Sequence, residues 1–170
     1  RQRQMCIRDR KTIDDVTHDY HLVESDTEIK KLIELLEQTE LFCFDTETTG
    51  LDTLEAKVVG LAFSWQEHTG YYVHIKEGDE QRVINLFKPI FSNSEIGKVA
   101  QNVKYDINVL LKYGVNLRGR LFDTMIAHYL LQPDMKHNMD FLSETYLNYR
   151  PVSIETLIGK KGKSQKTMRE

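Results

Sequence analysis

The stretch LFCFDTETTG, residues 41–50, decides the fold that we expect for this chain. Residues 41–46 are an apolar run of the length of one buried β-strand, and a Thr-Thr-Gly turn follows closely. Because side chains alternate between the two faces of a strand, Asp45 and Glu47 project from the same face at its end. Two neighbouring carboxylates repel each other unless a cation lies between them, and their hard oxygens suit Mg²⁺ or Mn²⁺. The alternative is that these acids only solvate the end of the strand.

Length and composition predict a single globular domain. The chain has 170 residues, of which 40% are hydrophobic, and a formal net charge of −3, which gives no support to a generally basic nucleic-acid-binding surface. Its two cysteines lie far apart in the sequence and form neither a disulfide framework nor a zinc pattern. No apolar run approaches the roughly 20 residues that span a bilayer, and no signal peptide is present, so we expect a cytoplasmic protein.

The two ends of the sequence differ from the middle. The first ten residues carry four arginines without periodicity, so we expect residues 1–19 to be a tail outside the domain, foreign or disordered. The alternative is a basic arm that binds nucleic acid. At the other end, the Lys-rich segment 159–170 brings no closing element, so we expect residues 20–170 to be a domain that is incomplete at its C-terminus.

Hydrophobic periodicity predicts alternating helices and strands. The expected strands are residues 41–46, 58–65, 70–75, 97–100 and 117–121. The expected helices are residues 26–38, 79–91, 122–131 and 138–147, and one that Asn102 caps and Gly114 ends. Ser25 and Glu28 form a capping box at the first helix. This order predicts an α/β fold with a mixed β-sheet flanked by helices.

A second acidic position follows the expected strand at residues 97–100. In QNVKYD, residues 101–106, helical spacing places Asn102 and Asp106 on one face. Asp106 is therefore a candidate third carboxylate near Asp45 and Glu47, the alternative being an exposed helix residue. Acids on a strand and on a helix are typical of two-metal phosphoryl chemistry, in which two ions about 4 Å apart activate a water and stabilise the leaving oxygen.

Four segments resemble one family. FDTETTGLD, residues 44–52, resembles the first motif of the DEDD exonucleases. The more specific segments begin at Ala100, Phe122 and Ile158, and read AQNVKYDINVLLKYGV, FDTMIAHYLLQPDMKHNMDFLSETYL and IGKKGKSQ. Together they resemble the 3′–5′ exonuclease (proofreading) domain of bacterial DNA polymerase I, a family A polymerase. The resemblance implies a ribonuclease H-like fold and hydrolysis of the 3′-terminal phosphodiester of DNA to nucleoside 5′-monophosphates, in replication and repair.

The resemblance also implies roles for single residues. Asp45 is implied to bridge two divalent ions, Glu47 to bind the ion that activates water, and Asp106 to serve the second ion. The implied ions are Mg²⁺ or Mn²⁺, with Zn²⁺ as an alternative at one site. The implied contacts with the single-stranded 3′ end of DNA are Thr46, Leu51, Gln101, Asn102, Tyr105, Lys136 and His137. Leu51 matches an apolar wedge against the terminal base.

Some of these positions have competing interpretations. Lys136 and His137 equally fit a solvated loop before a helix. Asp123 fits a helix N-cap better than a fourth ligand, and His128 and Tyr129 fit packing or a helix surface better than chemistry.

The chain departs from the family pattern at its end, because the third motif, a Tyr four residues before an Asp, is not present. We therefore expect this chain alone to have little activity, and its parent to be active as a monomer that carries a polymerase domain, near the bacterial nucleoid and without a membrane. The alternatives are a catalytically silent domain of a family A polymerase and an RNA-processing exonuclease of the same superfamily.

Overall fold

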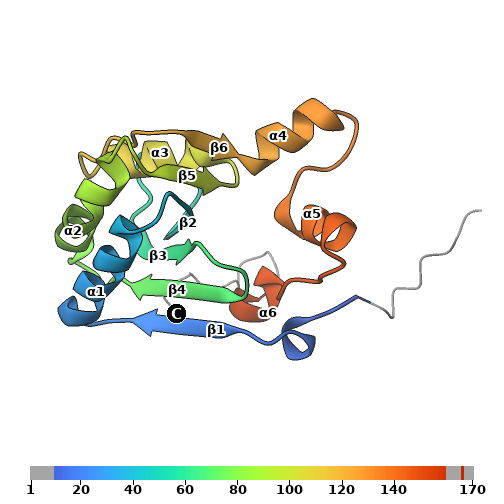
Figure 1. Ribbon diagram of the computed structural model, residues 1–170, viewed down its shortest axis with the longest axis horizontal. Helices are drawn as coiled ribbons and strands as arrows, with labels where there is room; N and C mark the ends of the chain where they lie inside the picture. Colours follow the sequence, from blue (N-terminus) through green and yellow to red (C-terminus); the bar gives the residue numbers. More distant parts are fainter. Residues whose placement is uncertain (1–9, 160–165, 167–170) are drawn as a thin grey trace, which may run out of the picture.

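The computed structural model describes residues 10–159 and residue 166. Its centre is a six-stranded sheet with the strand order β1-β4-β3-β2-β5-β6 (Figure 1). The strands are β1 (Asp19–Val23), β2 (Leu41–Thr48), β3 (Val58–Ser64), β4 (Thr69–His74), β5 (Gly97–Ala100) and β6 (Leu121–Asp123). β3 is antiparallel to β2 and β4, whereas the pairs β1–β4, β2–β5 and β5–β6 are parallel. The predicted mixed sheet is confirmed.

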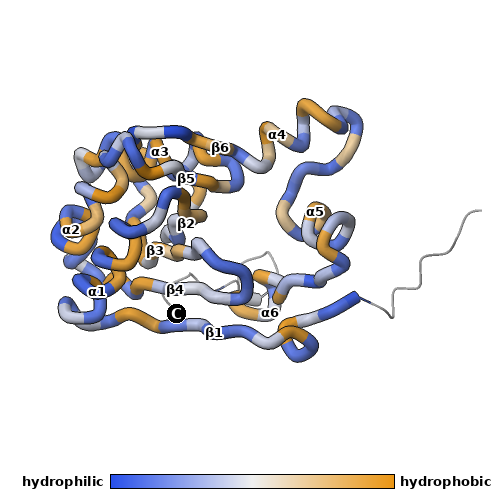
Figure 2. Tube along the Cα trace, viewed as in Figure 1, coloured by the Kyte–Doolittle hydropathy of each residue, from blue (hydrophilic) through white to orange (hydrophobic). Residues whose placement is uncertain are grey.

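Three helices bury the main core against one face of this sheet. They are α1 (Asp26–Glu37), α2 (Glu80–Ser92) and α3 (Val103–Leu111). Phe42 and Phe44 of β2 are almost fully buried among their apolar side chains, and the Phe44 ring lies 5.2 Å from that of Phe91. Figure 2 shows the hydrophobic segments of α1 and α2 gathered where these helices meet the strands. One face of β2 therefore packs in the core.

The later helices lie apart from α1 and α2 (Figure 1). They are α4 (Thr124–Leu131), α5 (Met139–Tyr146) and the short α6 (Ile154–Ile158). Their apolar side chains are less well covered, since Leu130 and Leu131 of α4 are 75% and 77% exposed. The part of the molecule around α4 and α5 is therefore open beside the strands.

Most predicted elements are confirmed, with shifts of one or two residues at their ends. The capping box at α1 forms as predicted, since Ser25 Oγ accepts from Glu28 N and the Glu28 carboxylate accepts from Ser25 N at 2.9 Å. The expected strand at residues 97–100 matches β5, and the expected hairpin is formed by β3 and β4. Pro89 lies inside α2, near its C-terminal end.

Three predictions about elements need correction. The strand expected at 117–121 is instead β6, Leu121–Asp123, because the chain before it turns tightly. Gly119 has φ +87° there, and a Cβ atom at this position would lie 2.6 Å from the Ile96 carbonyl oxygen. The sequence pattern also missed β1 and α6. β1 is an edge strand in which only Val23 is buried, so it lacks an alternating apolar pattern.

Part of the predicted N-terminal tail contacts the domain. Lys11 N donates to Asn148 O at 3.0 Å, and Arg150 N donates to Lys11 O at 2.8 Å. Residues 1–9 and most of the Lys-rich C-terminal segment (160–165 and 167–170) lie outside the described residues. Among the residues that are described, no helix has both the length and the apolar character needed to cross a membrane.

Candidate active site

The end of β2 carries the first two acids of the site. The pairing of β2 with β5 starts at Leu41 and ends at Cys43, which lies opposite Val99. The residues of β2 from Asp45 onward therefore extend past the end of β5. Asp45 and Glu47 are partly exposed on the face opposite Phe44. A register shift between Glu47 and Thr48 then ends the regular pairing with β3. The predicted placement of the two acids on one face is confirmed.

Helix α3 brings the third acid to the same strand. Asp106 is only 1% exposed, so it is not the solvent-facing residue of the alternative interpretation. Its Oδ1 atom accepts hydrogen bonds from Thr46 N at 3.0 Å and from Thr46 Oγ1 at 2.6 Å. Because Thr46 lies between Asp45 and Glu47, these bonds fix Asp106 directly beside the pair.

Burial makes negative charge unfavourable at all three carboxyl groups. It raises the pKa of Asp106 to about 6, against the hydrogen bond from Thr46, and the charge of Asp45 adds to the rise. Burial also raises the pKa of Asp45, and burial followed by the charge of Asp45 raises the pKa of Glu47. Within residues 10–159 and 166, no salt bridge reaches these acids. A bound cation would relieve their mutual repulsion.

The donor chemistry therefore fits a hard divalent cation, while the side-chain positions fit it less closely. No three His, Cys, Asp or Glu side chains among the described residues converge closely enough to hold one ion together. One reason is that Oδ1 of Asp106 already serves both Thr46 donors. Gathering the carboxylates around an ion would require side-chain movement.

An open cleft of about 510 Å³ lies over these acids. Eight of the residues predicted for the site line it: Asp45, Thr46, Glu47, Leu51, Gln101, Asn102, Tyr105 and Asp106. Three further residues line it that the sequence analysis did not single out: Ile154, Ile158 and Lys166. The segment that begins at Ile158 resembled the family, but no pattern in the sequence placed these three residues beside the acids. Lys136 and His137 are not among the lining residues.

A small hydrogen-bond network fixes the rim of the cleft. The Tyr105 hydroxyl donates to Gly50 O at 2.6 Å and lies 2.5 Å from Thr48 Oγ1. Thr48 Oγ1 also bonds Gly50 O, at 2.9 Å. The turn after β2 is thus tied to α3, and the Leu51 side chain beyond it is 92% exposed. An apolar side chain held in solvent beside buried acids is available to contact a ligand.

The N-terminus of α3 is capped differently from the prediction. Asn102 occupies the N-cap position with φ +62°, and its side chain makes no capping bond. Asp123 serves instead, because its carboxylate accepts from Asn102 N at 3.1 Å and from Val103 N at 2.8 Å. The same carboxylate accepts from Met125 N and Ile126 N, so the predicted N-cap role of Asp123 at α4 is confirmed.

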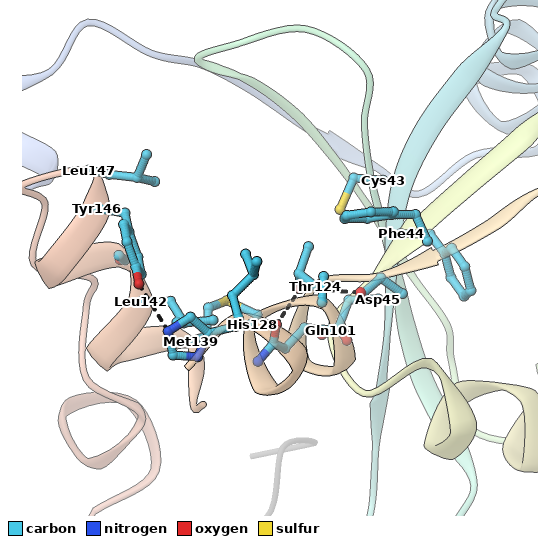
Figure 3. Close-up of a pocket in the computed structure, with 15 residues that line it drawn as sticks. Cys43, Phe44, Asp45, Gln101, Thr124, His128, Met139, Leu142, Tyr146 and Leu147 are labelled. Atoms are coloured by element: carbon cyan, nitrogen blue, oxygen red, sulfur yellow. Dashed lines mark hydrogen bonds between the residues drawn. The ribbon is translucent and has the colours of Figure 1, made fainter. Parts of the chain in front are cut away.

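Lys136 and His137 lie on the loop between α4 and α5, and only His137 has a contact with the cleft wall among the described residues. Gln101 Nε2 donates to the His137 carbonyl oxygen at 2.6 Å, which ties this loop to the cleft wall. The His137 Nδ1 atom lies 2.6 Å from Nδ1 of buried His128, whose Nε2 lies 3.0 Å from the Tyr146 hydroxyl. Figure 3 shows His128 and Tyr146 joined across a neighbouring cavity of about 550 Å³, which Asp45 also lines. His128 thus packs between helices, as predicted.

Comparison with known proteins assigns a family to this arrangement. A family model described as 3′–5′ exonuclease matches residues 20–169. The chain belongs to this family. DNA polymerase I of Borreliella burgdorferi is 36% identical over 155 residues, which are 88% of this chain and 17% of that protein. DNA polymerase I of Pseudomonas aeruginosa is 35% identical over 156 residues, or 85% and 17%. The chain thus matches the 3′–5′ exonuclease domain of DNA polymerase I and spans about a sixth of these relatives.

Solved structures confirm the predicted ribonuclease H-like exonuclease fold. The catalytic core of RRP6 from Trypanosoma brucei has a TM-score of 0.69 and 18% identity, covering 91% of this chain and 41% of that one. Escherichia coli RNase D has a TM-score of 0.66 and 19% identity, covering 81% and 36%. Brucella melitensis NrnC with bound Mg²⁺ has a TM-score of 0.61 and 18% identity, covering 88% and 70%. Escherichia coli RNase D, an exoribonuclease involved in structured RNA processing, thus shares the fold, whereas the two sequence relatives named above are DNA polymerases I.

Proposed function

We propose that this exonuclease domain removes nucleotides from the single-stranded 3′ end of DNA as the proofreading part of a longer DNA polymerase. The observation that carries the proposal is the set of three carboxyl groups, Asp45, Glu47 and Asp106, along one open cleft whose rim presents Leu51. The exonuclease unit begins near residue 20, where the family match starts. The polymerase domain belongs to the same parent chain, which acts as a monomer at the nucleoid in the bacterial cytoplasm.

The three acids provide the place for divalent ions. The charge of Asp45 acts on both of the other acids, since it raises the pKa of Glu47 and of Asp106. We therefore assign Asp45 as the shared ligand, with Glu47 and Asp106 on either side. Two Mg²⁺ or Mn²⁺ ions bound there, or Zn²⁺ at one position, would supply an activated water and stabilise the leaving 3′ oxygen. Thr46 keeps the Asp106 carboxylate in place through its two hydrogen bonds.

The rest of the cleft suits a DNA end of any sequence. Leu51 on one rim, and Ile154 and Ile158 on α6, offer apolar contact to the terminal base without reading its edges. Asn102 and Tyr105 line the cleft between these groups and the acids, as predicted for substrate contacts. Lys136 and His137 belong to the path of the strand outside the cleft, next to Gln101. Local contacts of this kind are compatible with a net charge of −3.

The test is an excision assay with a 3′-labelled single-stranded DNA and Mg²⁺ or Mn²⁺. Both the 170-residue chain and the full-length product of its gene are assayed, each as wild type, as Asp45→Ala and as Glu55→Ala, an exposed acid outside the cleft that serves as the matched control. We expect the full-length protein to release 5′-mononucleotides, and Asp45→Ala to lower the rate by at least about 100-fold, while Glu55→Ala leaves it unchanged.

Two outcomes contradict the proposal. Failure of the full-length protein to trim DNA with either ion would mean a silent structural domain. Preference for an RNA of the same sequence over the DNA would favour an RNA-processing enzyme.

A further inference from the structure

Two small residues of β3 lie directly opposite the acids of β2. In the antiparallel ladder Ala62 pairs with Asp45, and Gly60 pairs with Glu47. Paired residues share a face of the sheet, so both small residues lie on the acidic face. A glycine inside a buried strand weakens the strand and usually marks the close approach of another group. Gly60 therefore requires an explanation from its surroundings.

The group that approaches Gly60 is the side chain of Tyr72. Tyr72 in β4 pairs with Ala62, and its ring leans diagonally over Gly60 on the acidic face. A Cβ atom at position 60 would lie 2.2 Å from the Tyr72 hydroxyl oxygen and 2.4 Å from Cζ. Any residue other than glycine at position 60 would displace this ring. The absence of a side chain at Gly60, which we call the Gly60 seat, therefore determines where the Tyr72 hydroxyl lies.

That seat places the Tyr72 hydroxyl beside Glu47, the residue opposite Gly60. The electrostatics agree with this geometry, since burial and then the Glu47 charge raise the pKa of Tyr72. Tyr72 and Asp45 also line a common cavity of about 650 Å³ on this face of the sheet. The hydroxyl thus lies at the edge of the acidic site, on the side away from α3.

We propose that Tyr72 is a positioning residue for Glu47, and that its hydroxyl, seated over Gly60, donates a hydrogen bond that restrains the ionised Glu47 carboxylate. Among the described residues the two side chains are not bonded directly, so a bridging water or a small rotation of the carboxylate completes the contact. The inference rests on the proposed function, because it assigns Glu47 to the ion-binding site.

The experiment measures Mn²⁺ binding directly, from the electron paramagnetic resonance signal of free Mn²⁺, together with kcat and KM for DNA in the full-length protein. The variants are Tyr72→Phe, Gly60→Ala and the double variant. Tyr71→Phe is the matched control, because Tyr71 lies on the opposite face, where its ring stacks 4.8 Å from Trp65. Outer groups that orient a metal ligand typically affect metal affinity by 10- to 100-fold, so we expect Tyr72→Phe to weaken Mn²⁺ binding about 10-fold and to lower kcat with little change in KM.

The double variant tests the seat itself. If Gly60 acts by holding Tyr72, then Gly60→Ala should match Tyr72→Phe, and the double variant should be no worse than either. Should Gly60→Ala fail to fold, Tyr72→Phe still decides, because it removes only the hydroxyl. Wild-type Mn²⁺ affinity and kcat in Tyr72→Phe would overturn the inference. If the wild type itself neither binds Mn²⁺ nor trims DNA, and Asp45→Ala changes nothing, the proposed function has failed instead.

Discussion

At the scale of single residues, folding and catalysis make opposite demands on the carboxyl group of Asp106. Folding buries it to 1% exposure, where ionisation is unfavourable, and its pKa rises to about 6. A role in binding cations requires the ionised form at neutral pH. Thr46 offsets part of the cost of ionising the buried Asp106 carboxyl group, because it donates two hydrogen bonds to one oxygen of that group. Without a cation the folded protein therefore carries an unfavourable charge.

We predict that Asp106→Asn stabilises the cation-free protein at pH 7. The Asp106 carboxyl group has a pKa of about 6 in the folded protein, against 3.8 for an ordinary aspartate, so the unfolded chain loses this proton first as the pH rises. Stability is therefore lost between about pH 4 and pH 6, and the loss corresponds to about 3 kcal/mol at pH 7. Asparagine keeps an oxygen for the two Thr46 donors but carries no charge. Urea unfolding at pH 4 and pH 7 should show the gain at pH 7 alone, and an equal gain at both values would contradict the prediction.

We predict that removing the charge of Lys98, a buried cation that has a structural role, destabilises the protein. Its ammonium group donates to the carbonyl oxygens of Asn93, Ile96 and Arg118 at 2.5–2.9 Å, and the residue is 1% exposed. Lys98→Met keeps the apolar stem but leaves three carbonyl groups without this donor, so the free energy of unfolding should fall by about 2–4 kcal/mol. Exposed Lys104→Met is the matched control and should change stability by less than about 0.5 kcal/mol. Chemical denaturation of both variants measures the difference.

At the scale of elements, one carboxylate organises the start of two helices. Asp123 ends β6, caps α4 and accepts two amide hydrogens at the N-terminus of α3. This arrangement leaves the Asn102 side chain free of capping, so it lines the cleft. The sequence predicted the cap at α4, because an acid before an apolar helix is a local signal. It could not predict the cap at α3, which depends on β5 and β6 being neighbours.

We predict that Asp123→Ala lowers the free energy of unfolding by about 2–4 kcal/mol, because four backbone amides lose an acceptor. Asp123→Asn retains one oxygen, so it should lose about half as much. The cleft should respond as well, since the backbone of Asn102 and Val103 is no longer held. Hydrogen exchange of the amides at 102, 103, 125 and 126 would report this directly. Faster exchange at α4 alone would mean that the cap on α3 contributes little.

At the scale of the whole molecule, the site depends on contacts between distant parts of the chain. The sequence was sufficient to predict that Asp45, Glu47 and Asp106 lie close together, because the first two lie at the end of an apolar strand and the third lies in the first turn of a helix. It was insufficient for Ile154 and Ile158, which line the cleft only because α6 returns to it. Edge strand β1 was missed for a related reason. Its pairing with β4, rather than its own composition, makes it a strand.

The same dependence leads to our last prediction, that a divalent cation stabilises the entire fold through this site. The three acids come from β2 and α3, so ions bound among them would join two elements whose unfolding would release the ions. An ion that binds only the folded state, at a concentration 100 times its dissociation constant, adds about 2.7 kcal/mol to the free energy of unfolding. For a chain of this length that raises Tm by about 5–10 °C.

We expect Mn²⁺ to raise the Tm of the wild type in this way, and to have much less effect on Asp45→Ala and Asp106→Asn. Scanning calorimetry with and without Mn²⁺ provides the measurement, and Na⁺ at equal ionic strength controls for the effect of salt. Because Asp106→Asn should already be stabilised without the ion, the two variants separate the relief of repulsion from binding itself. A wild type whose Tm is unchanged by Mn²⁺ would mean that the acids do not act as one site in this chain.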